Sequence, residues 1–129
     1  MNKIRLCLTG GGTGGHIYPA LPIYSYLKKQ DLLEKTIYVG NKDKAEGLIV
    51  PKENIEFYHI GSAPLSGISP GKRFNTLFLL IKGTFHGISF IIKNRPDLIV
   101  ATGGYVSAPI VFAAFLLKWI FKIKIVLQE

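Results

Sequence analysis

Residues 4–16 read IRLCLTGGGTGGH, a short apolar run followed by five glycines among six residues and then a histidine. The apolar run at 4–9 has no polar alternation, which predicts a strand buried on both faces, as in a parallel sheet. A helix is predicted to follow over 17–29, with Pro19 in its first turn. Glycines allow positive φ and close approach of a ligand, and a helix start offers N–H groups without helical acceptors. This turn therefore predicts a phosphate-binding loop.

The same arrangement recurs further along the chain, where a predicted strand at 98–102 leads through Gly103 and Gly104 into a predicted helix at 105–118. The remaining predicted elements are strands at 36–39, 55–60 and 123–127, helices at 44–50 and 72–94, and an exposed loop at 61–71. Alternating strands and helices predict an α/β, Rossmann-like parallel sheet with helices on both faces. Both glycine turns then lie at the carboxyl edge of the sheet, where they would form a two-pronged anion site.

Composition limits the classes of protein. The chain has 129 residues, 48% of them hydrophobic, which suits one globular domain and excludes a disordered chain. Cys7 is the single cysteine, so no intramolecular disulfide forms and a reducing compartment is expected. The start of the chain has no pattern of a signal peptide. The uncharged run at 98–117 is long enough to cross a membrane, but its glycine pair and Pro109 favour strand, turn and helix.

The formal net charge is +8, and residues 70–129 carry eight basic side chains against two acidic ones. A one-sided positive field predicts an anionic partner such as membrane lipid, nucleic acid or a phosphorylated substrate. No nucleic-acid motif is present, and the basic residues accompany a Phe/Ile-rich face, so nucleic acid is not expected.

The first glycine turn partly matches two known phosphate-binding motifs, the P-loop and the dinucleotide fingerprint. A P-loop NTPase would need Lys and Ser/Thr where His16 and Ile17 stand. The dinucleotide fingerprint is matched at Gly10, Gly12 and Gly15, but the expected acid after the second strand is missing, and Asp43 is a poor substitute. A dinucleotide-binding domain therefore stays an alternative. From spacing alone, His16 is equally a solvated side chain or a general base.

Three motifs in order carry a more specific resemblance. They are GGTGGHIxPAL at 11–21, ExxIVP at 46–51 and GGYVSxP at 103–109. Together they resemble the amino-terminal half of the MurG family of bacterial N-acetylglucosaminyltransferases. The resemblance implies a GT-B fold and transfer of GlcNAc, with inversion, from UDP-GlcNAc to undecaprenyl-pyrophosphoryl-MurNAc-pentapeptide (lipid I to lipid II). Residues 1–129 would be the acceptor-side domain, incomplete at its C-terminal end and inactive without the absent donor-binding domain.

The resemblance also implies residue roles. His16 matches the proposed general base, and the implied contacts to the UDP-GlcNAc diphosphate are Thr13, Gly14 and Gly15. The implied contacts to the acceptor diphosphate are Gly12, Gly103, Gly104, Tyr105 and Ser107. No cofactor and no metal are expected. The family usually reads His-Glu-Gln-Asn after the fifth strand, whereas this sequence has Gln128 in place of the His, then Glu129, and does not include the Asn that contacts the donor sugar in the family.

The segment 72–94 predicts an apolar, basic helix. One face of this helix, whose inner stripe is expected to pack on the core, carries Phe74, Leu77, Phe78, Ile81, Phe85, Ile88 and Ile92. Leu79, Leu80, Phe90 and Ile91 widen the apolar surface beyond one contact. The helix is therefore expected to lie on an anionic bilayer at the cytoplasmic face of the bacterial cell membrane, as a peripheral contact. The predicted contact residues are Lys72, Arg73, Phe74, Leu77, Phe78, Ile81, Lys82 and Phe85. A further alternative is a non-catalytic, membrane-associated subunit of a split GlcNAc transferase.

Overall fold

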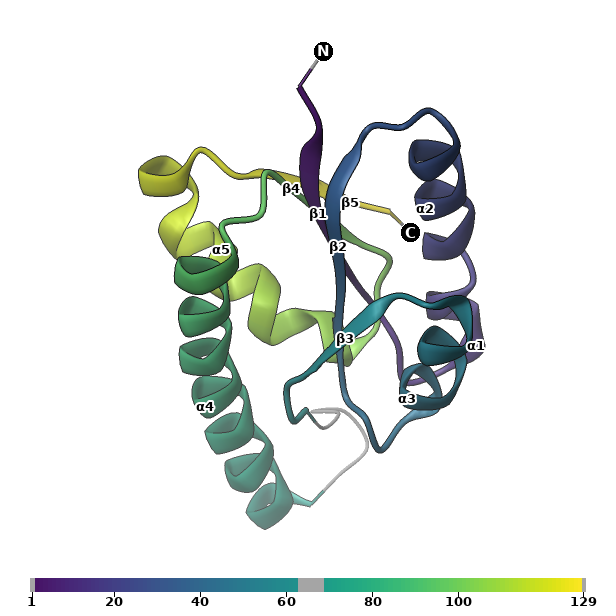
Figure 1. Ribbon diagram of the computed structural model, residues 1–129. Coiled ribbons are helices and arrows are strands. Elements are labelled where there is room, and N and C mark those ends of the chain that lie inside the picture. The colour runs from purple at the N-terminus through teal and green to yellow at the C-terminus, as the bar shows by residue number, and fades with distance from the viewer. Residues whose placement is uncertain (1, 63–68, 129) are drawn as a thin grey trace.

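The computed structural model describes residues 2–62 and 69–128. Five parallel strands form one sheet in the order β3-β2-β1-β4-β5 (Figure 1). The strands are β1 (Ile4–Thr9), β2 (Leu33–Gly40), β3 (Glu56–His59), β4 (Leu98–Ala101) and β5 (Lys124–Leu127). The predicted parallel α/β sheet is confirmed, and the uncharged run at 98–117 divides into strand, turn and helix as expected.

Helices cover both faces of this sheet. One face is covered by α1 (Gly14–Ile17), α2 (Ala20–Lys29), α3 (Ala45–Ile49) and the 3-10 turn η1 (Val50–Glu53). The other is covered by α4 (Pro70–Asn94) and α5 (Ala108–Phe121), the latter preceded by the 3-10 turn η2 (Tyr105–Ser107). Two apolar clusters result, one on each face, and β1 contributes Leu6 and Leu8 to one and Cys7 to the other.

The helix predicted over 17–29 is in fact two helices. α1 ends at Ile17, and α2 begins at Ala20 after Pro19 as its N-cap residue. Proline has no N–H and its ring crowds the preceding turn, so a continuous helix through this position is disfavoured. The consequence for the site is that the glycine turn leads into a helix of a single turn. Most of the predicted loop at 61–71 falls on residues 63–68, outside the described part of the chain.

Most of the core face predicted for the helix at 72–94 is wrong, since of its residues Ile88 packs against the core cluster and the others are exposed. The buried residues of α4 are Thr76, Gly83, Gly87, Phe90 and Ile91. A Cβ on Gly83 would lie 3.0 Å from Cβ of Pro109, and one on Gly87 would lie 2.9 Å from Cβ of Ala113. These small residues let α4 approach α5 closely, so the face that carries Phe74, Phe78 and Phe85 points outward, while Phe90 and Ile91 pack on the core.

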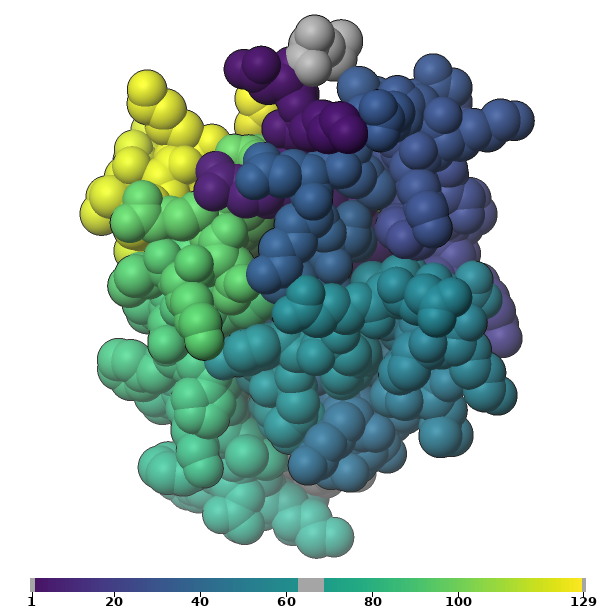
Figure 2. Space-filling view, viewed as in Figure 1, coloured from purple at the N-terminus to yellow at the C-terminus, as the bar shows by residue number. Residues whose placement is uncertain are grey.

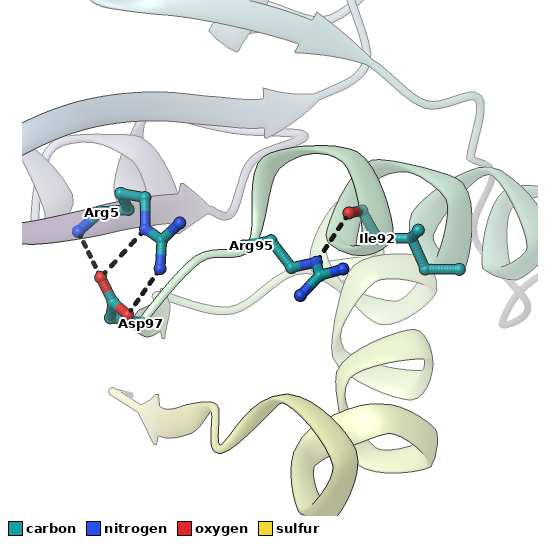
Figure 3. A network of polar contacts seen from close by, with 4 residues as sticks. All are labelled: Arg5, Ile92, Arg95 and Asp97. Atoms are coloured by element: carbon teal, nitrogen blue, oxygen red, sulfur yellow. Dashed lines mark hydrogen bonds and ion pairs between the residues drawn. The ribbon is translucent and has the colours of Figure 1, made fainter.

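At the amino ends of the strands, Asp97 joins β4 to β1. Its carboxylate accepts the backbone N–H of Arg5 at 2.8 Å and pairs with the Arg5 guanidinium at 3.2 Å (Figure 3). Arg95, which ends α4 in a left-handed conformation, donates from Nε to the carbonyl of Ile92 at 3.0 Å. These contacts fix the connection from α4 into β4 at the edge opposite the glycine turns.

Candidate active site

The two glycine turns lie side by side at the carboxyl edge of the sheet, because β1 and β4 are neighbouring strands. The Gly11 N–H donates to the carbonyl of Gly103 at 3.2 Å, and the Thr102 N–H donates to the carbonyl of Thr9 at 2.9 Å. Gly103 and Gly104 have φ of +105° and +83°, a region that side chains rarely adopt. A Cβ on Gly104 would also overlap the carbonyl oxygen of Gly11. The predicted pairing of the turns is confirmed, and glycine is required where they meet.

His16 lies between the two turns. Its Nδ1 is 3.4 Å from the carbonyl oxygen of Thr102, and a Cβ on Gly103 would lie 3.0 Å from the same nitrogen. The Thr102 hydroxyl donates to the carbonyl of His16 itself, so both the ring and the backbone of His16 are held by Thr102. A carbonyl only accepts, which places the imidazole proton on Nδ1 and leaves the lone pair on Nε2. The structure thus favours the base-competent tautomer of His16.

Glu46 is a site residue whose role sequence reasoning missed. Its side chain is fully buried; Oε2 accepts the Gly12 N–H at 3.0 Å, and Oε1 accepts the Asn41 N–H at 3.0 Å. A Cβ on Gly11 would overlap this carboxylate, and one on Gly40 would lie 2.7 Å from Cγ of Glu46. The sequence feature that could have indicated this role is the ExxIVP motif, together with the glycines at the ends of β1 and β2. Glu46 positions the first turn, and because both of its carboxylate oxygens accept backbone N–H groups, Glu46 does not replace the missing ribose-binding acid of a dinucleotide site.

Two tyrosines contact the first glycine turn. The buried Tyr38 hydroxyl donates to the carbonyl of Gly10 at 2.6 Å, and burial together with the Glu46 charge raises the Tyr38 pKa above its ordinary range. A Cβ on Gly12 would lie 3.1 Å from the Tyr105 ring, so Tyr105 of the second turn covers Gly12 of the first. The Gly12 amide is already engaged by Glu46, and Gly12 therefore contributes space rather than a free N–H.

The other residues expected in the site fall into two groups. Thr13 precedes α1 and is exposed, and Gly14 and Gly15 begin that helix. The first amides of a helix have no helical acceptor, so those of Gly14 and Gly15 can donate to an anion. Ser107 is buried instead, and its hydroxyl donates to the carbonyl of Gly104 at 2.9 Å. Ser107 therefore stabilises the second turn from within.

The predicted membrane-contact residues on α4 are exposed. Phe74 is 77% exposed, Phe78 and Phe85 are each 67% exposed, and Leu77 and Ile81 are close to half exposed. Lys72, Arg73 and Lys82 are exposed beside them. In Figure 2 the green side chains of α4 form one flank of the molecule. By length and composition alone this helix could cross a membrane, but in the fold it packs on α5 and the sheet.

Sequence comparison identifies the family to which this domain belongs. Residues 6–129 match the glycosyltransferase family 28 N-terminal domain. The chain belongs to glycosyltransferase family 28. The family 28 relatives at 36% identity include the protein from Lactococcus lactis named UDP-N-acetylglucosamine–N-acetylmuramyl-(pentapeptide) pyrophosphoryl-undecaprenol N-acetylglucosamine transferase, matched over 89% of this chain and 32% of its own.

A protein of the same name from Symbiobacterium thermophilum is 36% identical over 98% of this chain and 33% of its own. The crystal structure of Acinetobacter baumannii MurG superposes with a TM-score of 0.78 at 25% identity, covering 96% of this chain and 34% of that one. The family 28 domain described here thus spans about a third of the length of the curated relatives it matches. The resemblance to the MurG family is confirmed, as is the likeness to the MurG N-terminal domain.

Proposed function

We propose that this family 28 domain is the acceptor-side half of a GlcNAc transferase of peptidoglycan synthesis. The donor would be UDP-GlcNAc, and the acceptor undecaprenyl-pyrophosphoryl-MurNAc-pentapeptide. The observation that carries the proposal is the position of His16, whose ring lies against the second glycine turn while the first turn leads into its helix. One imidazole base and two glycine turns at a single edge suit a hydroxyl nucleophile attached to a diphosphate.

The proposed step is a single displacement with inversion. Nε2 of His16 takes the proton of the MurNAc C4 hydroxyl as its oxygen bonds to C1 of GlcNAc. The bond from C1 to the UDP oxygen breaks, and its electron pair leaves with UDP. The amides of Gly14 and Gly15 would stabilise diphosphate charge. Both walls of a GT-B cleft are needed to align this reaction, so residues 1–129 alone should not transfer GlcNAc.

A chimera tests this assignment. Residues 1–129 would replace the matching segment of the Lactococcus lactis relative, and transfer of labelled GlcNAc to the lipid-linked acceptor would be measured. The chimera should be active, and His16→Gln should lower kcat by about 100-fold or more, since a positioned base contributes about that much. Lys29→Gln, on α2, is the matched control and should leave kcat unchanged. Full activity of the His16→Gln chimera would refute the base assignment.

We further propose that the exposed face of α4 holds the domain on the cytoplasmic face of the bacterial cell membrane. Its phenylalanines would enter the interface, while Lys72, Arg73 and Lys82 contact anionic headgroups. Each basic residue contributes about 1 kcal/mol near such a surface, so changing all three to Glu should weaken liposome binding by at least about 100-fold. The matched control changes Lys28, Lys29 and Lys52, on the other side of the sheet. Equal flotation of both triple variants with anionic liposomes would contradict the assignment.

A further inference from the structure

A cavity lies between the edge strand β3 and the middle of α4, and no residue of the glycine turns is among its described lining residues. Its volume is about 370 Å³. The residues that line it are Tyr58, His59, Gly61, Leu79, Lys82, Gly83 and His86. On α4, positions 79, 82, 83 and 86 form one ridge, which faces the end of β3. His59 and His86 are distant in the sequence, and the fold brings them to one hollow.

The charge of this cavity is positive. Three basic side chains line it, His59, Lys82 and His86, and no carboxylate is among its described lining residues. All three are exposed, so a ligand can reach them from solvent. Both imidazoles can donate N–H bonds and the ammonium adds a fixed charge, a combination that suits the oxygens of a phosphate group.

His59 is held in a defined orientation. Its Nδ1 accepts the backbone N–H of Lys42 at 3.0 Å, which leaves Nε2 as the nitrogen that carries the proton. Partial burial lowers the pKa of His59, and the charges of Lys42 and His86 lower it further, whereas Asp43 opposes them. An anion bound beside the ring would reverse this balance. His59 is therefore a neutral donor when the cavity is empty and gains a proton more readily when an anion is bound.

We propose that this cavity, which we call the β3–α4 pocket, binds a phosphate group as a monoester or diester. The exposed side chains of Phe78, Ile81 and Phe85 lie on the same helix, so a lipid headgroup and a soluble phosphate ester can both deliver that group. The proposal does not depend on glycosyl transfer, since His16 and the glycine turns are not part of this pocket.

The first arm of the test uses inorganic phosphate and the full chain. Phosphate is titrated at constant ionic strength, with chloride as reference, while NMR follows the backbone amides of Gly61 and Gly83 and the ring protons of His59. Saturable shifts are expected, together with a higher apparent pKa of His59. The double variant His59→Gln/His86→Gln should weaken binding at least tenfold, and Lys29→Gln should not. A response identical to that of chloride, or unchanged affinity in the double variant, counts against a soluble ligand.

The second arm uses vesicles of phosphatidylglycerol and of phosphatidylcholine. Loss of phosphatidylglycerol binding in the double variant, which keeps Lys82 and the apolar face, assigns the pocket to a lipid headgroup. Saturable phosphate binding with unchanged vesicle binding assigns it to a soluble ester. If the double variant changes neither, the proposal is overturned. Because transfer by the chimera is measured separately, this failure is distinct from failure of the proposed function.

Discussion

The two edges of the sheet are built from different interactions. At the amino ends of the strands, side chains pair with each other, as in Lys3–Asp31 at 2.9 Å and Arg5–Asp97 at 3.2 Å. A third pair, Lys35–Glu56 at 3.8 Å, belongs to the same edge. At the carboxyl ends no ion pair occurs among residues 2–62 and 69–128. There, buried side chains bond to the backbone of the glycine turns, as Glu46 does with Gly12.

This difference predicts that the stability of the domain depends more on the polar contacts at the carboxyl edge than on those at the amino edge. Exposed ion pairs contribute little because water and salt screen them. Groups without access to water lose most when a partner is removed. Buried side chains at the carboxyl edge fix the shape of the glycine turns, whose outer surface is the ligand site that we propose. Substitutions at that edge should therefore have larger effects than substitutions at the amino edge.

The largest effect is expected at the contact between the two turns. Gly104→Ala places a Cβ against the carbonyl of Gly11 at a φ of +83°. Strain and overlap together should lower the free energy of unfolding by about 3 kcal/mol. Gly71→Ala is the control, since no atom of residues 2–62 and 69–128 lies within 4 Å of its added Cβ. Urea unfolding measures both variants, and similar midpoints would show that the turns do not need their close contact.

A smaller loss is expected from the buried carboxylate beneath the first turn. In Glu46→Gln, an amide NH₂ faces one of the two N–H groups that Glu46 accepts, so one hydrogen bond becomes a contact between donors. The free energy of unfolding should fall by about 2 kcal/mol. The amide resonances of Gly12 and Asn41 should shift, which reports the positioning role directly. Glu53→Gln, at an exposed position, is the control, and an unmoved Gly12 resonance would contradict this role.

Tyr38 supports the same turn through a neutral hydrogen bond to the Gly10 carbonyl. Tyr38→Phe removes the donor to the Gly10 carbonyl and keeps the ring packed. The expected loss is about 1 kcal/mol in the free energy of unfolding, again measured in urea. Tyr26→Phe, whose side chain is 63% exposed, should change nothing measurable. If the two variants lose equal stability, the Tyr38 hydroxyl does not stabilise the turn.

Sequence alone predicted the parts of the site that follow from strand order. Apolar runs ending in glycines indicated β1 and β4, and a parallel sheet brings both turns to one edge, with His16 between them. Sequence did not predict which backbone N–H groups of the glycine turns lack a partner within the domain. Glu46 uses the Gly12 N–H and Ser107 is directed inward, and such contacts depend on the approach of α3 and η2 to the turns.

The orientation of α4 shows a second limit of sequence reasoning. Hydrophobic periodicity assigns the core face to the largest apolar side chains, yet α4 packs through Gly83 and Gly87 against α5. Two helices that pack at close distance need small residues at their contact. A hydrophobic pattern in the sequence does not mark such residues as part of the core. The phenylalanines left outside are exposed and form the surface that we propose as the membrane contact. That contact stays a prediction, whereas most of the predicted core face was wrong.

The smallest effect is expected at the amino edge, from Asp97→Asn. The hydrogen bond from Arg5 lowers the pKa of Asp97 below its ordinary value, so the carboxylate stabilises the fold above that value. This contribution disappears as the pH falls through the pKa of the folded state. At pH 7 the variant should lose at most about 1 kcal/mol, because Asp97 is partly exposed and its pair is screened.

The pH dependence separates this effect from a general loss of packing. The difference in urea midpoint between Asp97→Asn and the unmodified chain should be constant from pH 7 to pH 5. It should then shrink toward zero in more acidic buffer, where Asp97 itself is protonated. Asp31→Asn is the control, since that carboxylate is 84% exposed in its pair with Lys3. If Asp97→Asn destabilises the domain as much as Glu46→Gln does, the two edges are equally dependent on their polar contacts, and the division of roles between them is wrong.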